Sequence, residues 1–423
     1  MRFSTLKDWL SWQETLHPNE IELGLERVKK VFSALHTEVP AFKVITIAGT
    51  NGKGSSVSML QSILIDAGYR VGAYTSPHIF HYNERVCLNG VPVEDSAFIN
   101  SFERIDRARG ETSLTYFEFG TLAALDIFYQ SQLDIVLLEV GLGGRLDAVN
   151  IIDPDVALIT SIDIDHTAWL GETREMIAAE KAGIMRRSGP VVFSGTDIPD
   201  AIRFSAETMG AQLHVLNEDF YYAKTTSGWS WHDNETHSVA LPVPALFGAH
   251  QLQNAAGIIK VLKCLADVYP VNNQSIRQGL LKAHLRGRFE VTPATTTLAE
   301  RVFDVAHNSQ AIKQLSENLL SRPVKGKTVV VIAMLADKEC ADAIITLLPV
   351  VDLWFCGSIA TSRGLSAEQL AERLLSSIDS NRIRTFEHVA EAYMAACDNT
   401  NNEDRIVITG SFITVAEVLE QSV

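Results

Sequence analysis

The chain has 423 residues, 46% of them hydrophobic and 21% charged, a composition typical of a soluble globular protein rather than a disordered one. This length favours two domains of unequal size over a single core. The formal net charge of −15 disfavours nucleic acid or an anionic membrane surface as a partner, because the field of the whole molecule repels polyanions.

Five cysteines are scattered along the chain without CxxC spacing, which argues against a disulfide framework and against a zinc site. They are Cys87, Cys264, Cys340, Cys356 and Cys397. The first 20 residues carry acidic side chains and no apolar signal segment, and no apolar run approaches the length of a membrane span. These features predict a protein of the reducing cytoplasm.

From Lys43 onward, apolar runs of strand length alternate with helical patterns. Continuous apolar strands separated by amphipathic helices indicate a parallel sheet covered on both faces, which is a doubly wound α/β domain. We expect strands within 43–49, 70–76, 134–141 and 156–162, and helices within 56–68, 119–132 and 173–186.

The pattern changes between about 190 and 245, where short alternating segments predict a small antiparallel excursion rather than another crossover. Helices are expected at 250–268 and 275–283. After a Thr-rich segment at 284–297, a second α/β alternation begins, with expected strands at 301–307, 328–335, 352–357, 384–387 and 405–411 and helices between them. We therefore predict a first domain of residues 1–287 and a smaller second domain of residues 288–423, with a hinge at about 285–299.

The stretch GTNGKGSS at residues 49–56 stands where the first of these strands passes into a helix. A glycine-rich turn that feeds a helix N-terminus presents N–H groups to phosphate oxygens, so the stretch predicts a site for a nucleotide triphosphate. Lys53 would reach the terminal phosphates, and Ser55 or Ser56 would face Mg²⁺. The usual P-loop pattern has a glycine where Ile47 stands, which leaves a turn with a surface lysine as the alternative.

This loop resembles the ATP loop of the Mur ligase superfamily, and an ordered set of further motifs resembles its folylpolyglutamate synthase branch over nearly the whole chain. The motifs are ELGLERV (22–28), TSPHIFHYNERV (75–86), LTYFEFGT (114–121), LLEVGLGGRLDAVN (137–150), SIDIDHTAWLG (161–171), EKAGI (180–184), GRFE (287–290), DVAHN (304–308) and GSF (410–412). The resemblance implies a P-loop ATP-binding doubly wound domain followed by a smaller Rossmann-like α/β domain.

The activity implied by this resemblance is an ATP-dependent ligase that joins L-glutamate to 7,8-dihydropteroate and adds further glutamates to reduced folates. ATP would phosphorylate the substrate carboxylate, and the glutamate amine would attack the acyl phosphate, with release of ADP and phosphate. A monofunctional folylpolyglutamate synthase remains the alternative.

By the same resemblance, Mg²⁺ is held by Ser76, Glu139 and His166. Glu139 ends an apolar strand, where a carboxylate is costly unless something pairs with it. The alternative for Glu139 is an acid that caps the strand end beside Arg145, and the local pattern alone favours a hydrogen-bonded loop residue for His166. The resemblance also implies a monovalent cation such as K⁺.

Lys181 stands beside a glutamate, and the ordinary expectation for such a lysine is an exposed ion pair. The resemblance implies instead that Lys181 is carbamylated and supports the metal site. Carbamylation requires a deprotonated amine, which desolvation favours.

The resemblance assigns ATP contacts to the loop and to three further residues. Asn254 would read the adenine edge, with a helix N-cap as its alternative role. Arg288 and Asp304 would bind phosphate and ribose, so ATP would lie between the domains and their closure would expel water. The loop contacts are Thr50, Asn51, Gly52, Lys53, Gly54 and Ser55.

His307 and Ser411 would receive the incoming glutamate, with local turn hydrogen bonds as the alternative. The catalytic residues implied are Lys53, Glu139, His166, Lys181 and His307. The pterin substrate would contact Glu22, Leu23, Gly24, Leu25, Thr115, Tyr116, Phe117, Glu118, Leu146, Asp147 and Ala148. Phe117 offers a flat apolar face to an aromatic ring system, and the carboxylates can accept hydrogen bonds from an aminopyrimidine edge.

Two rival functions are disfavoured. A Mur-type ligase for a UDP-linked muropeptide would need an N-terminal domain before the loop, and only 48 residues precede Gly49. A regulatory nucleotide-binding module without turnover would not need Lys53, Glu139, His166 and Lys181 together. The resemblance implies a monomer that acts on small molecules, and the net charge argues against nucleic acid or a membrane as a partner.

Overall fold

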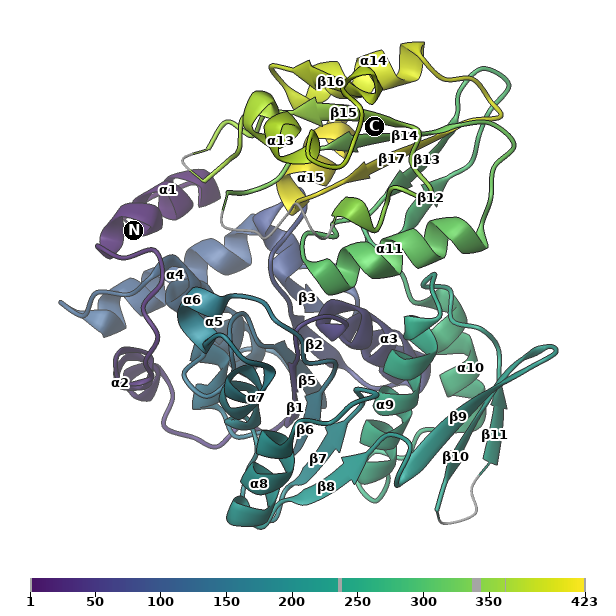
Figure 1. Ribbon diagram of the computed structural model, residues 1–423. Helices are drawn as coiled ribbons and strands as arrows, with labels where there is room; N and C mark the ends of the chain where they lie inside the picture. The colour runs from purple at the N-terminus through teal and green to yellow at the C-terminus, as the bar shows by residue number, and fades with distance from the viewer. Residues whose placement is uncertain (1, 235–237, 337–343, 362, 422–423) are drawn as a thin grey trace. The chain divides into compact units, whose positions relative to one another are not determined.

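The computed structural model describes residues 2–234, 238–336, 344–361 and 363–421. The chain divides into two compact units (Figure 1). Unit 1 contains residues 1–245 and 251–284, and unit 2 contains residues 246–250 and 285–423. This division falls between His284 and Leu285, whereas we predicted a boundary between residues 287 and 288 with a hinge at about 285–299. Residues 246–250, which we placed in the first domain, belong to unit 2.

An eight-stranded sheet forms the framework of the described part of unit 1, in the order β4-β3-β2-β5-β1-β6-β7-β8. Six strands run parallel, and β3 and β4 are antiparallel additions at one edge. Ile47 of β1 lies opposite Glu139 of β5 on one side and Leu158 of β6 on the other. The segments that follow these three strands therefore leave the sheet at the same edge. The bounds are β1 Lys43–Ala48, β2 Val71–Tyr74, β3 Val86–Leu88, β4 Val91–Pro92, β5 Ile135–Glu139, β6 Val156–Ile159, β7 Pro190–Phe193 and β8 Gln212–Val215.

Apolar side chains cover both faces of this sheet. On one face, Val44, Val136 and Leu138 share a core with the helices α1, α2, α4, α5 and α7. The alternate residue Leu158 faces α9, where a Cβ on Gly257 would lie 3.5 Å from its side chain. Helix α3 contacts β1, β2 and β5 and packs against α10. Because both faces are buried, the strands read as continuous apolar runs, and the doubly wound architecture is confirmed.

The helices of unit 1 begin at side-chain caps in several places. Thr115 and Glu118 form a capping box at the start of α5, and Thr173 and Asn272 cap α7 and α10. The bounds are α1 Leu6–Leu16, α2 Glu26–Leu35, α3 Lys53–Asp66, α4 Asp95–Arg109, α5 Tyr116–Tyr129, α6 Thr167–Leu170, α7 Arg174–Ala182, α8 Asp200–Met209, α9 His250–Cys264 and α10 Asn273–Lys282, with the 3₁₀ turns η1 Tyr82–Arg85 and η2 Ala148–Ile151.

The interpretation of residues 190–245 as one antiparallel excursion was wrong in its first half. Strand β7, helix α8 and strand β8 form another crossover, and β7 pairs with both β6 and β8 in parallel. The antiparallel excursion is confined to three strands, β9 Phe220–Thr225, β10 Gly228–Asp233 and β11 Ser238–Leu241. Trp231 of β10 is fully buried and donates its indole N–H to the carbonyl oxygen of Ala256 at 3.1 Å, so this small sheet supports α9.

Unit 2 is a smaller α/β unit whose described strands follow the order β12-β13-β17-β14-β15-β16. Five strands run parallel, and β12, inside the expected hinge segment, is an antiparallel edge strand. The second alternation is therefore confirmed where it is described. The bounds are β12 Glu290–Thr292, β13 Glu300–Phe303, β14 Thr328–Ile332, β15 Leu353–Gly357, β16 Ile383–Phe386, β17 Arg405–Thr409, α11 Ser309–Ser321, α13 Ala367–Leu374, α14 Val389–Asp398, α15 Phe412–Gln421 and the 3₁₀ turn η3 Ser380–Arg382.

The described residues can be compared with the sequence in two further respects, the state of the cysteines and the length of the apolar helices. Four cysteines, Cys87, Cys264, Cys356 and Cys397, are free thiols, and Cys340 lies outside the described residues. Within the same ranges, none of the helices combines the length and the apolar character that crossing a bilayer demands.

Candidate active site

The glycine loop of unit 1 joins β1 to α3 in a conformation that only glycine adopts easily. Gly49 and Gly52 have φ angles of +146° and +92°. A Cβ on Gly49 would lie 1.8 Å from the hydroxyl oxygen of Thr160, and one on Gly52 would lie 2.6 Å from the amide oxygen of Asn254. The loop backbone is therefore in close contact with β6 and α9, and it leads directly into the N-terminus of α3, where N–H groups bind anions.

Hydrogen bonds to the segment after β6 hold the loop in place. The N–H of Thr50 donates to the carbonyl oxygen of Ser161 at 2.7 Å, and its hydroxyl exchanges hydrogen bonds with the backbone of Asp163 at 3.0 Å. The hydroxyl of Thr160 donates to the carbonyl oxygen of Asn51 at 2.7 Å. These contacts fix the loop before any ligand arrives.

Two lysines converge on the carbonyl oxygen of Gly49. The ammonium of Lys53 donates to it at 2.9 Å and to the carbonyl oxygen of Thr50 at 3.1 Å, and Lys181 donates to it at 3.1 Å. Lys181 is buried, and burial together with the charge of Lys53 lowers its pKa to about 7. The alternative of an exposed ion pair for Lys181 was wrong, because the neighbouring Glu180 bonds Arg145 at 2.8 Å.

Asp147 brings a carboxylate into electrostatic range of both lysines. It is buried, and it accepts hydrogen bonds from the N–H groups of Leu142 at 2.7 Å and Val149 at 3.0 Å. Burial raises the pKa of Asp147 to about 6, although these hydrogen bonds and the charge of Lys53 act in the opposite direction. The structure thus gathers Lys53, Lys181 and Asp147, which the sequence separates by up to 128 positions.

Of the three residues expected at magnesium, Glu139 ends β5, Ser76 follows β2, and His166 lies at the start of α6. Glu139 is buried at the end of β5, and one of its carboxylate oxygens lies 3.4 Å from the N–H of Ser76, which follows β2. His166 follows β6, is exposed and has a left-handed φ of +53° at the start of α6. In the described ranges, no three His, Cys, Asp or Glu side chains form a metal-binding group. A metal held here would therefore also need hydroxyl, water or phosphate oxygens, which are ligands that Mg²⁺ prefers.

Asn254 lies inside α9 and does not cap it, so the N-cap alternative was wrong. Its amide donates to the side-chain oxygen of Gln251 at 3.0 Å, and Gln251 donates to the hydroxyl of Ser55 at 3.3 Å. All three residues are buried. Our sequence analysis did not single out Gln251, although its position one turn before Asn254 on the same helix face could have suggested it.

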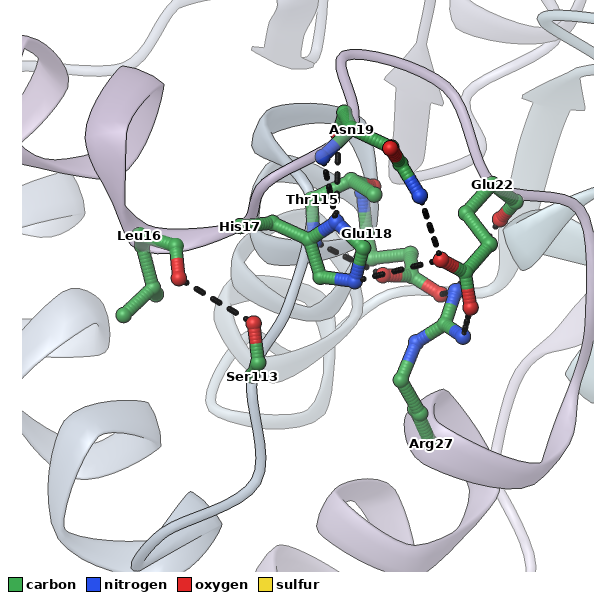
Figure 2. Close-up of polar contacts among 8 residues, drawn as sticks. All are labelled: Leu16, His17, Asn19, Glu22, Arg27, Ser113, Thr115 and Glu118. Atoms are coloured by element: carbon green, nitrogen blue, oxygen red, sulfur yellow. Dashed lines mark hydrogen bonds and ion pairs between the residues drawn. The ribbon is translucent and has the colours of Figure 1, made fainter.

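The residues expected to contact the pterin lie on three segments of unit 1. Glu118 accepts a hydrogen bond from the N–H of Thr115 at 2.8 Å in the capping box of α5, and Glu22 belongs to the segment between α1 and α2 (Figure 2). Both carboxylates are bound by Arg27, a residue that our sequence analysis did not single out. Burial lowers the pKa of Arg27. The hydrogen bond and charge of Glu118 and the charge of Glu22 outweigh burial, so the pKa of Arg27 is raised overall.

The aromatic and apolar residues of this set are mostly half-buried. The ring of Phe117 lies 6.1 Å from that of Tyr74, and a Cβ on Gly141 would lie 2.5 Å from it, so the ring covers the backbone that follows β5. The segment 141–148 that follows β5 also carries Asp147. The half-buried members are Leu23, Gly24, Leu25, Tyr116, Phe117 and Leu146, whereas Ala148 is buried.

In unit 2, the expected residues gather around the ends of β13 and β17. Asp304 is half-buried and accepts hydrogen bonds from the N–H groups of Phe289 and Ala306, both at 2.9 Å. Burial raises its pKa to about 6, against the charge of Arg288, which lowers it. Arg288 also stacks on Phe412, with 5.4 Å between its guanidinium carbon and the ring centroid.

His307 and Ser411 lie on the segments that follow these strands. One ring nitrogen of His307 contacts the carbonyl oxygen of Val305 at 2.8 Å, and its ring lies 6.0 Å from that of Phe412. Ser411 is buried and accepts a hydrogen bond from the N–H of Thr414 at 3.0 Å. The local turn hydrogen bonds that we gave as the alternative are therefore present. They do not test whether His307 and Ser411 also contact glutamate.

Comparisons with known proteins agree with this arrangement. The family model of the Mur ligase middle domain matches residues 47–262, and that of the Mur ligase glutamate ligase domain matches residues 287–412. The chain is 43% identical to the dihydrofolate synthase/folylpolyglutamate synthase of Escherichia coli strain K12 over 417 residues, which cover 99% of this chain and 95% of that protein.

Two solved structures are similar over almost their full length. One is E. coli FolC in complex with DHPP and ADP, with a TM-score of 0.93, 43% identity, and coverage of 99% of this chain and 98% of that chain. The other is a bifunctional folylpolyglutamate synthase/dihydrofolate synthase with Mn, AMPPNP and L-glutamate bound, with a TM-score of 0.90, 43% identity and the same coverage. The chain therefore belongs to the Mur ligase family and, within it, to the dihydrofolate synthase/folylpolyglutamate synthases.

Proposed function

We propose that this chain is an ATP-dependent ligase that joins L-glutamate to 7,8-dihydropteroate and adds further glutamates to reduced folates. The observation that carries the proposal is the glycine loop before α3, with Lys53 and Lys181 on the carbonyl oxygen of Gly49 and Asp147 in electrostatic range. The full-length similarity to proteins with both activities in their names supports the substrate assignment.

The reaction needs activation because a carboxylate is a poor electrophile with a poor leaving group. The substrate carboxylate attacks the γ-phosphorus of ATP, forming an acyl phosphate and releasing ADP. The glutamate amine then attacks the acyl carbon, loses a proton and forms the amide as phosphate leaves. Catalysis of this kind rests on positioning and charge neutralisation, which a cationic loop in a desolvated site supplies.

Lys53 and the loop would bind the phosphates. The N–H groups at the start of α3 point along the helix axis toward the loop, and positive φ angles at Gly49 and Gly52 let the backbone approach phosphate oxygens. Lys53, now bonded to two loop carbonyls, would exchange them for phosphate oxygens. The contacts of Thr50, Asn51, Gly52, Gly54 and Ser55 belong to the same proposal.

A divalent cation, Mg²⁺ with ATP, would be held by Ser76, Glu139 and His166. Glu139 fits this role because it is a buried carboxylate at a strand end. When bound, the cation would neutralise phosphate charge. Ser76, whose N–H already lies 3.4 Å from Glu139, would keep that carboxylate oriented.

Lys181 would be carbamylated. Its amine is buried with a pKa of about 7, so a large fraction is neutral near pH 7.5 and can attack CO₂. The N–C bond forms as one proton leaves, and the ammonium becomes an anionic carbamate beside the positive charge of Lys53. A monovalent cation such as K⁺ is part of this proposal, and the dependence of activity on K⁺ over Na⁺ would test it.

The remaining roles are divided between the two units. In unit 1, Asn254 would bind the adenine, and Glu22 to Leu25, Thr115 to Glu118 and Leu146 to Ala148 would border the pterin. In unit 2, Arg288 and Asp304 would bind phosphate and ribose, and His307 and Ser411 would bind glutamate. We propose that the enzyme works as a monomer in the cytoplasm.

A side-by-side assay tests the proposal. The purified chain would be given Mg²⁺, ATP and L-glutamate with either 7,8-dihydropteroate or a reduced folate, and the conjugated product would be measured by chromatography. Product from both acids supports the bifunctional assignment. Product from the reduced folate alone would replace it with a monofunctional folylpolyglutamate synthase, and product from neither would overturn the proposal.

A further inference from the structure

Arg27, the second residue of α2, connects two segments that lie far apart in the sequence (Figure 2). One amino group of its guanidinium bonds a carboxylate oxygen of Glu22. The other donates to the backbone carbonyl oxygen of Glu22 at 3.0 Å and to the carboxylate of Glu118 at 2.8 Å. A single side chain thus ties the segment before α2 to the first turn of α5.

Burial makes the bond between Arg27 and Glu118 costly to break. The side chain of Glu118 is only 4% exposed and that of Arg27 is 24% exposed. One oxygen of the Glu118 carboxylate faces Arg27, and the other closes the capping box by accepting from the N–H of Thr115. A buried carboxylate that loses its cation is left uncompensated, so removal of Arg27 would disturb the start of α5 as well as the segment.

The carboxylate of Glu22, on a side chain that is 38% exposed, is also bound within the protein. Besides the guanidinium, it accepts a hydrogen bond from the amide of Asn19 at 3.0 Å and lies 3.5 Å from a ring nitrogen of His17. His17 is 7% exposed at its side chain. Glu22 and Glu118 therefore act here as anchors for Arg27, rather than as acceptors that wait for an aminopyrimidine edge.

The two connected segments are two of the three that we propose to border the pterin. Leu23, Gly24 and Leu25 follow Glu22 directly, and Tyr116 and Phe117 lie between the two members of the capping box. A Cβ on Gly24 would meet no atom within 4 Å, so the backbone of this segment borders open space. The position of that backbone relative to α5 depends on the contacts of Arg27.

We infer that Arg27 is a positioning residue that fixes the segment 22–25 against the first turn of α5 and so sets the affinity for the pteridine acid. The inference rests on the proposed function. The planar guanidinium of arginine donates hydrogen bonds to two carboxylates and a carbonyl oxygen at the same time. The single ammonium of lysine cannot reproduce this geometry.

The test compares Arg27→Gln with Arg104→Gln. Arg104 bonds Asp126 of the same helix α5, a carboxylate that is 1% exposed, but two turns further along the helix. We expect Arg27→Gln to raise the KM for dihydropteroate and for the reduced folate about tenfold or more, with the KM for ATP changed less than about twofold. Arg104→Gln should lower the melting temperature and leave all KM values within about twofold.

Arg27→Lys and the double variant Arg27→Gln with Glu118→Gln keep the inference testable if Arg27→Gln does not fold. The first keeps a positive charge beside Glu118, and the second removes the buried charge that Arg27 compensates. Each should still raise the KM for the pteridine acid, by about threefold or more.

Two results would overturn the inference. One is a folded Arg27 variant whose KM for both acids equals that of the wild type. The other is a loss of selectivity, in which the KM for ATP rises as much as the KM for the acids, or Arg104→Gln raises the KM for the acids as much as Arg27→Gln does. Either outcome would indicate a structural role only. An inactive wild type would overturn the proposed function itself, so the two failures are distinguishable.

Discussion

The ammonium of Lys181 lies 3.1 Å from the carbonyl oxygen of Gly49, the same oxygen that Lys53 contacts at 2.9 Å. Helix α7 thereby reaches the glycine loop between β1 and α3. Two cationic side chains on one oxygen favour loss of a proton from the more buried of them, which is Lys181.

The free energy of unfolding should depend on pH because folding lowers the pKa of Lys181. Its folded pKa of about 7 lies below its ordinary value of 10.5, so the unfolded chain binds more protons between these values and stability through this group rises with pH there. The free energy of unfolding of the wild type minus that of Lys181→Met should therefore rise by about 1.4 kcal/mol per pH unit between about pH 7 and pH 10. Urea titrations in CO₂-free buffer measure it, and a difference that does not vary with pH would contradict the lowered pKa.

Carbamylation of Lys181 should appear directly with labelled bicarbonate. We expect a carbamate signal in the ¹³C spectrum of the wild type that is missing from Lys181→Met. A matched sample of Lys53→Met should keep the signal, because Lys53 is not the modified amine. Identical spectra for the wild type and Lys181→Met would reject the modification.

Replacement of Lys53 should abolish turnover and leave the fold intact. We expect Lys53→Met to lower kcat about 100-fold or more, because the positive charge that meets the phosphates is lost. Lys43→Met is the matched control, since Lys43 begins the same strand β1 at its other end and pairs with Asp155 at 2.8 Å. Similar losses of kcat in both variants would refute the assignment of Lys53.

Gly49→Ala should impair both stability and ATP binding. The new Cβ would lie 1.8 Å from the hydroxyl of Thr160 at a positive φ, so we expect a loss of roughly 1–3 kcal/mol and weaker nucleotide binding. Gly68→Ala shares the positive φ but would meet no atom within 4 Å. Calorimetry with a non-hydrolysable ATP analogue should show weakened binding for Gly49→Ala only, and equal binding by both variants would contradict the role of the loop.

His307→Ala should raise the KM for glutamate much more than the KM for ATP. His307 lies in the segment that follows β13, where we propose that glutamate binds, and its contact with the carbonyl oxygen of Val305 at 2.8 Å orients the imidazole there. The exposed His388, at the start of α14 in the same unit, provides the control His388→Ala. Steady-state kinetics with each substrate varied in turn would decide, and equal changes in both KM values would refute the assignment.

The strands of the sheet could be predicted from the sequence where they are continuous apolar runs. The runs at β1, β5 and β6 are continuous because both of their faces are buried, and the helices between them follow the 3.6-residue period. The crossover through β7 and β8 was missed because β8, at the sheet edge, exposes Gln212 and half-buries Leu213 and His214. A short edge strand of this kind carries no clear apolar pattern.

The local structure around the candidate site can be predicted from sequence where a motif carries its own geometry. The glycine loop is local, whereas the burial of Lys181 depends on α7 packing against the rest of unit 1. Its helix face offered a signal, since Ile177, Ala178 and Lys181 recur at helical spacing and are all buried. The contact between Arg27 and Glu118 joins positions 91 residues apart, and nothing local to either residue indicates it.

The most direct test of the account is a product balance for the purified chain with Mg²⁺, ATP, 7,8-dihydropteroate and L-glutamate. The account predicts dihydrofolate, ADP and phosphate in equal amounts, and none of them when the pteridine acid is omitted. ATP hydrolysis without a conjugated product, or no phosphate release at all, would contradict it.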